Sequence, residues 1–230
     1  DDIVTQTISR SSGFGTTNIN LGQISNKGVE ILLTGTPVRG ALTWDISLNF
    51  AKNNNNVDYI SAALNEITGE EPRTRNVYIK HIVGMPYGQI TGRVQQVSPD
   101  GTPIFNLDGT PLASTTYVPV GNGVPNFTGG VNNTFSYKGF NLDFLVDFKS
   151  GGDIFSGTNN RLTQQGFHEQ SLIGREGETP LHVTGVTRSG AGSEASPYVY
   201  TPIDRDLTPH EAQVYWNRVG GESTAISNMF

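Results

Sequence analysis

The stretch that most constrains the fold is 131–149, VNNTFSYKGFNLDFLVDFK, because its side chains alternate in character with a period of two. Every second position is apolar (Phe140, Leu142, Phe144, Val146, Phe148), and polar residues lie between them (Asn141, Asp143, Asp147, Lys149), with Leu145 the one exception. This period predicts a strand with one apolar and one polar face. Lys138-Gly139 separates it from a similar run, and glycine supplies the positive φ of a tight turn. We therefore predict a β-hairpin over 131–149.

A second predicted hairpin covers 28–51. Its return strand alternates without error: Leu42, Trp44, Ile46, Leu48 and Phe50 are apolar, whereas Thr43, Asp45, Ser47 and Asn49 are polar. The run KNNNN at 52–56 predicts the end of that strand, since asparagine favours turns. Strands of about nine residues have the length that a tilted strand needs to cross a bilayer.

Composition restricts the class of protein. The chain has 230 residues with 28 Gly and 12 Pro, and only 35% are hydrophobic, which favours turn-rich β structure. No apolar run is long enough for a transmembrane helix, but a transmembrane barrel needs apolar residues only at alternate positions. The net charge of −6 argues against nucleic-acid binding. No signal peptide is recognisable at Asp1-Asp2-Ile3, so we expect a mature product or a piece of a longer protein.

The connections between the hairpins are very unequal in length. The turns span a few residues, whereas 53–128 and 150–230 read as long loops, with short strands such as 87–97 and a short helix near 208–218 that Thr208 caps. Short turns at one end and long loops at the other are typical of outer-membrane barrels. A soluble β-sandwich alternates in the same way, so the pattern alone leaves both architectures open.

Several segments resemble the SusC/RagA-type TonB-linked outer-membrane proteins. NKGVEILLTGTPVRGALTWDISLNFAKNNNNV is similar to a hairpin of that family, VGMPYG at 83–88 to its "vGxPxG" segment, and GGVNNTFSYKGFNLDFLVDFKSGGDIF to a later hairpin. Asp100-Gly101, Asp108-Gly109 and Val120-Gly121-Asn122 with Pro125 are similar to its "D-G … G-N-x-x-P" loop. The resemblance covers about 26–175 and favours the barrel over the sandwich.

The resemblance implies an all-β fold, as part of a large antiparallel transmembrane barrel in the outer membrane of a Gram-negative bacterium. Such barrels have 22 strands around a plugged lumen. It also implies a SusD-like surface lipoprotein as partner, TonB as the energy source, and oligosaccharides or peptides as cargo. No plug, TonB box or N-terminal accessory domain is recognisable in the sequence, and four strands cannot close a barrel. We therefore expect a fragment of a transporter, without cofactor.

Site residues follow from the same reading. Asp45, Asn49, Asp143 and Asp147 are expected to face the lumen, as solvated lining rather than ligand contacts. The lipid-facing set is Leu42, Trp44, Ile46, Leu48, Phe50, Phe140, Leu142, Phe144, Val146 and Phe148. Loop candidates for ligand contact are Tyr87, Gln89, Arg93, Asp153, Asn159 and Arg161, since aromatic and amide groups stack on and bond sugars or peptides.

Chemistry beyond binding is not indicated. His81, His168, His182 and His210 have no metal-ligand spacing, and no acid–base pair is recognisable, so we expect neither a metal site nor an enzyme. Two other functions remain open: a soluble or surface β-sandwich that binds glycans, and a passive porin. The substrate is not assigned.

Overall fold

The computed structural model describes residues 3–7, 11, 13–14, 16–20, 22–61, 64–69, 77–175 and 179–221. The chain divides into two compact units. The first comprises 1–68, 80–89 and 122–153, and the second 69–79, 90–121 and 154–230. Antiparallel strands dominate the described residues, so the predicted all-β antiparallel class is confirmed.

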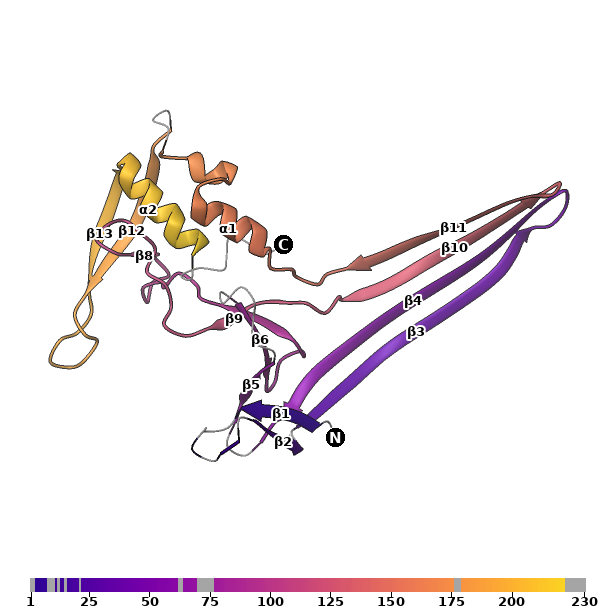
Figure 1. Ribbon diagram of the computed structural model, residues 1–230, viewed down its shortest axis with the longest axis horizontal. Coiled ribbons are helices and arrows are strands. Elements are labelled where there is room, and N and C mark those ends of the chain that lie inside the picture. Colours follow the sequence, from indigo (N-terminus) through magenta and orange to yellow (C-terminus); the bar gives the residue numbers. More distant parts are fainter. Residues whose placement is uncertain are drawn as a thin grey trace. The chain divides into compact units, whose positions relative to one another are not determined.

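The first unit is built around one long four-stranded sheet. Its strands are β3 (Gln23–Val38), β4 (Leu42–Tyr59), β10 (Phe127–Tyr137) and β11 (Phe140–Ser150), in the order β11-β10-β4-β3 (Figure 1). Neighbouring strands are antiparallel throughout. Lys138 and Gly139 both have positive φ, 46° and 89°, which is the conformation that lets a two-residue turn join β10 to β11.

β4 is longer than the sequence predicts, because the asparagine run does not end it. Asn53–Asn56 continue to pair with β3, as far as Tyr59 opposite Gln23. The Asn53 side chain donates to the Asn26 side chain across the pair, at 3.1 Å. A partner strand that supplies both backbone and side-chain hydrogen bonds outweighs the turn preference of asparagine.

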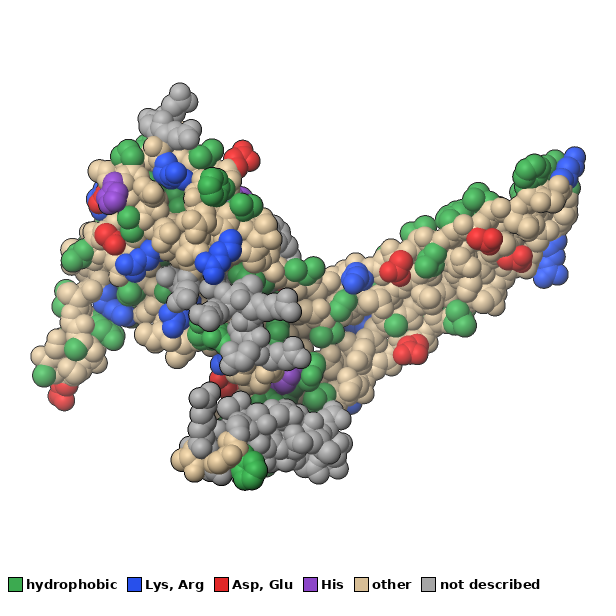
Figure 2. Space-filling model, viewed as in Figure 1, with side chains coloured by type: hydrophobic (Ala, Val, Ile, Leu, Met, Phe, Trp, Pro, Cys, Tyr) green, Lys and Arg blue, Asp and Glu red, His purple; other side chains and the backbone are tan. Residues whose placement is uncertain are grey.

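The register gives the long sheet one apolar face. Leu48 of β4 lies opposite Leu33 of β3 and Val131 of β10, and Val131 lies opposite Val146 of β11. Aromatic rings continue the row, with Trp44 stacked on Phe135 at 5.5 Å. The residues predicted as a lipid-facing set therefore share one face, and Asp45, Asn49, Asp143 and Asp147 share the other. Figure 2 shows acidic side chains spaced along the visible side of this sheet.

Shorter strands complete the first unit. β1 (Ile3–Thr7) pairs with β2 (Thr16–Asn20), and β5 (Glu66–Thr68) pairs with the end of β6 (Val77–Ile82). A small core forms where β4 ends: Val57 and Ile60 are buried and contact partly buried residues (Ile24, Leu64, Ile67, Val83).

The second unit combines a small sheet with helices. β12 (Leu181–Ser189) pairs with β13 (Val199–Leu207) and, in parallel, with β8 (Ile104–Phe105). It also contains most of β7 (Gln89–Gly92) and β9 (Val118–Asn122). Its helices are α1 (Gly157–Gln165), the 3₁₀ helix η2 (Glu169–Leu172) and α2 (Pro209–Gly220). No helix among the described residues is long and apolar enough to cross a membrane.

Two clusters form the core of this unit. Phe105, Val183, Leu207 and Ala212 bury the contact between sheet and α2, and Val77 and Ile90 pack with Val120 and Phe155. The predicted helix near 208–218 is confirmed as α2, with Thr208 as N-cap and Pro209 in its first turn. α1 and the β12–β13 hairpin lie where the sequence predicts a loop.

Candidate functional site

The six predicted ligand residues are divided between the two units. Tyr87, Gln89 and Asp153 lie in the first unit, and Arg93, Asn159 and Arg161 in the second. Asp153, Asn159 and Arg161 each make a hydrogen bond within the fold. The Asp153 carboxylate accepts from the Asn122 amide at 2.7 Å, the Asn159 amide donates to the Ser156 hydroxyl at the start of α1, and Arg161 bonds Gln164.

Tyr87 is an exposed aromatic residue of the first unit. It lies in the turn between Gly84 and Gly88, both with positive φ, and its ring stacks on His81 at 3.9 Å. Burial lowers the pKa of His81, and its Nδ1 accepts a hydrogen bond from the Gly88 amide at 3.3 Å. Tyr87 is 43% exposed, whereas Gln89 is 7% exposed and bonds the Pro86 carbonyl. A ligand can therefore reach Tyr87, and Gln89 is enclosed.

Arg93 has an unusual environment in the second unit. Its guanidinium lies over the Tyr117 ring, 5.3 Å from the centroid, and Tyr78 meets Tyr117 edge-on at 4.7 Å. The Arg93 Nε is buried and has no hydrogen-bond partner in the part of the chain that the structure describes. Buried polar atoms in folded proteins are normally bonded. A guanidinium that stacks on tyrosine and keeps free donors is suited to bind a carboxylate.

Some side chains on the polar face of the long sheet form hydrogen bonds with one another. Asp45 accepts from the Thr36 hydroxyl at 2.6 Å, and Asp143 accepts from the Thr134 hydroxyl. Asn49 and Asp147 flank Gly130, where an added Cβ would lie 3.2 Å from Asn49 Oδ1 and 3.5 Å from Asp147 Oδ1. The missing side chain leaves these two polar groups open above the sheet.

A cavity of about 300 Å³ lies between α1 and α2. The polar residues Gln164, Gln165, Arg175, His210, Gln213 and Asn217 line it together with Trp216. The sequence reading did not predict this site. Ser156 and Gly166, the N-cap and C-cap on either side of the nine-residue helix α1, are the local signals that could have located its first helix.

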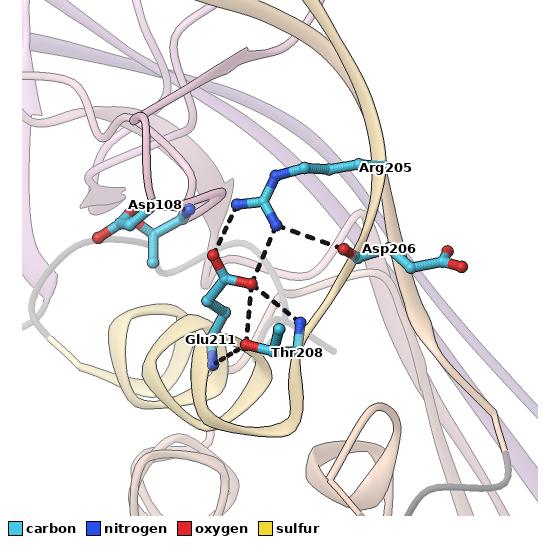
Figure 3. Close-up of polar contacts among 6 residues, drawn as sticks. Asp108, Arg205, Asp206, Thr208 and Glu211 are labelled. Carbon is cyan, nitrogen blue, oxygen red and sulfur yellow. Dashed lines mark hydrogen bonds and ion pairs between the residues drawn. The ribbon is translucent and has the colours of Figure 1, made fainter.

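α2 is fixed in place by a charged contact near its N-terminus. Arg205 on β13 donates from two nitrogens to the Glu211 carboxylate at 2.8 and 2.9 Å, and Glu211 also accepts from the Thr208 amide (Figure 3). The Arg205 hydrogen bonds, then those from Thr208, lower the pKa of Glu211 to about 2. This pair joins the sheet to the helix that forms one wall of the cavity.

His182 on β12 lies between two carboxylates of β13. Its Nδ1 is 2.7 Å from Asp206 Oδ1, and its Nε2 is 2.7 Å from Asp204 Oδ1. Asp204 also accepts from the Thr184 hydroxyl at 3.0 Å. The hydrogen bond to Asp206, followed by that to Asp204, raises the pKa of His182 above its usual value.

This arrangement predicts a pH dependence of the β12–β13 hairpin. Because the pKa of His182 is raised on folding, its stabilisation is fully present below about pH 6.5 and is lost as the pH rises through the folded-state value. We expect hydrogen-exchange protection of the hairpin amides, corrected for intrinsic exchange, to fall from pH 6 to pH 9. His182→Gln should abolish this fall. An unchanged pH profile in that variant would exclude His182 as the titrating group.

Comparison with known proteins identifies relatives of one kind. No protein-family model matches the chain. Two curated relatives from Formosa agariphila are TonB-dependent receptor P39, 26% identical over 64% of this chain and 19% of its own length, and TonB-dependent receptor P3, 24% identical over 64% of this chain and 17% of its own. The chain thus spans about a fifth of the length of the curated relatives it matches.

The fold is similar to that of a solved structure. The solved structure of the RagAB peptide transporter aligns with 68% of this chain and 18% of its own, with a TM-score of 0.50 and 20% identity. In sequence the chain is similar to TonB-dependent receptors, and in fold it is similar to the RagAB peptide transporter.

Proposed function

We propose that this chain forms wall and loops of an outer-membrane transporter that imports oligosaccharides or peptides in a Gram-negative bacterium. TonB supplies the energy, and a SusD-like lipoprotein is the partner at the surface. The observation that carries the proposal is the apolar face of the long sheet, which is continuous over four strands. The names of the relatives, receptors and a peptide transporter, support the same assignment.

Exposure of the apolar face distinguishes this function from a soluble glycan-binding sandwich. Leu33, Leu142 and Val146 are 59%, 60% and 52% exposed. In a sandwich these side chains would form the core between two sheets. In a barrel they face lipid, which is the solvent of that surface. The polar face then lines the lumen, with Asp45, Asn49, Asp143 and Asp147 among its solvated groups.

The test is made on the intact protein in its native bacterium. We expect it in the outer-membrane fraction, soluble only in detergent, and we expect labelled oligosaccharide or peptide uptake to stop when the gene is deleted. Dissipating the proton-motive force should also stop uptake, whereas a passive porin would continue. Recovery of the protein as a detergent-independent soluble species would overturn the proposal.

Arg93 and Tyr87 are the loop residues that we assign to ligand contact. Arg93→Ala should weaken binding of an acidic cargo about tenfold, because it removes the guanidinium that lies over the Tyr117 ring. Arg93→Lys keeps the charge but loses the planar fork, and should recover part of the affinity. Isothermal titration of the intact protein measures both. Equal affinity of the wild type and Arg93→Ala would show that Arg93 makes no ligand contact.

A further inference from the structure

The cavity between α1 and α2 has walls that hydrogen bonds hold in position. Asn217 Nδ2 donates to the Gln164 carbonyl at 3.2 Å, which joins α2 to α1. Trp216 Nε1 donates to the Ile173 carbonyl at 2.9 Å. Gly220 allows the close approach, because an added Cβ would lie 2.2 Å from the Gln164 amide nitrogen. These contacts hold the walls of the cavity in place, so the side chains that line it need little rearrangement to bind a ligand.

Its charge is positive. Among the described residues that line it, Arg175 is the only one with a permanent charge, and none is an aspartate or glutamate. The chain as a whole carries a net charge of −6. A cavity with a guanidinium and no described carboxylate in its lining therefore differs in charge from the chain as a whole. An anionic group is the partner that this arrangement favours.

Arg175 uses only part of its hydrogen-bonding capacity within the fold. Its Nη1 donates to the Gly166 carbonyl at 3.0 Å, at the C-terminal end of α1, where a cation also favours the helix dipole. Its Nε and Nη2 donate to no residue that the structure describes. Gln213 and His210, three residues apart on α2, line the same cavity and likewise have no described hydrogen-bond partner. These free donors and acceptors surround one space.

We propose that the α1–α2 cavity binds the terminal carboxylate of a small solute. Arg175 takes the carboxylate, and Gln213 and His210 bond the hydroxyl or amide groups next to it. A volume of about 300 Å³ is at the small end of ligand pockets, and it fits one or two units of a chain rather than a long oligomer. The inference that the cavity binds transported cargo rests on the function proposed above. The inference that it binds a carboxylate does not.

Isothermal titration of the intact protein in detergent tests the proposal with two pairs of probes. The first pair is galacturonate and its methyl ester, and the second is N-acetyldiglycine and N-acetyldiglycine amide. We expect at least one acid to bind and its neutral counterpart to bind at least tenfold more weakly. The arm that responds identifies the source of the carboxylate as sugar or peptide. Failure of both acids to bind overturns the proposal.

Variants separate binding from folding. Gln213→Ala removes a side chain that has no hydrogen bond to a described residue, and it should weaken binding of the acid three- to tenfold. Arg175→Lys keeps one donor for the Gly166 carbonyl at the end of α1, and it should weaken binding of the acid more than tenfold. Arg218→Gln is the control, because it removes a charge from α2 outside the cavity, and it should leave the affinity unchanged. An equal loss in Arg218→Gln would show that net charge alone attracts the acid, and would overturn the proposal.

Uptake measured on the same variants distinguishes this inference from the proposed function. If the acid binds specifically but is not transported, the proposed carboxylate site would stand and the proposed transport function would be contradicted. If the wild type binds neither acid, and Arg175→Lys and Gln213→Ala transport normally, the proposed transport function would stand and the proposed carboxylate site would be wrong.

Discussion

Leu48→Arg is expected to prevent assembly of the intact protein into the outer membrane. Leu48 lies on the apolar face of the long sheet, between Leu33 of β3 and Val131 of β10. An arginine on the lipid face of a barrel costs about 2–4 kcal/mol near the bilayer midplane. The measurement is the amount of folded protein in outer-membrane fractions, and Phe144→Arg on β11 should have the same effect.

Ser47→Arg is the matched control for this change. Ser47 is the neighbour of Leu48 on the same strand and lies on the opposite, polar face. An arginine there enters a solvated surface, so assembly should be close to that of the wild type. Equal damage from Ser47→Arg and Leu48→Arg would mean that both faces are buried. That result would contradict the solvated polar face, and with it the assignment of the apolar face to lipid.

The sequence predicts the long sheet well because its signal is local and strong. Alternation in Leu42–Phe50 and Phe140–Phe148 determines which side chains share a face, and the structure adds the register that aligns them over four strands. Asn133 shows what alternation cannot predict. It is buried in the apolar row, where it accepts from Trp44 Nε1 at 3.1 Å and so provides a partner for the indole.

The second unit is predicted less well, because tertiary contacts rather than periodicity decide its elements. The β12–β13 hairpin has Pro202 in one strand and Gly185 in the other, residues that weaken the strand pattern. Gly185 is required there, since an added Cβ would lie 2.4 Å from the Pro103 carbonyl. The α1–α2 cavity joins residues about 50 positions apart, such as Gln164 and Asn217, and no local pattern relates them.

Gly129→Ala is the second change with a large expected effect. Gly129 on β10 lies opposite Phe50 on β4 and Phe148 on β11, and the Phe148 ring covers it. An added Cβ would lie 2.5 Å from the Phe148 ring and 2.7 Å from the backbone oxygen of Asn49. The ring can rotate away, but the backbone oxygen belongs to the paired strand and cannot move without disturbing the sheet. Overpacking of this kind costs about 1–3 kcal/mol.

Gly130→Ala is the control one residue along the same strand. Its added Cβ would meet only side-chain atoms, the nearest being Asn49 Oδ1 at 3.2 Å, and the amide can turn aside. We expect the urea midpoint of the intact protein to fall clearly for Gly129→Ala and to change little for Gly130→Ala. Equal midpoints for both variants would contradict the close β4–β10 approach at Gly129. A large loss at Gly130 alone would instead show that the polar face is packed there, which would argue against a solvated lumen.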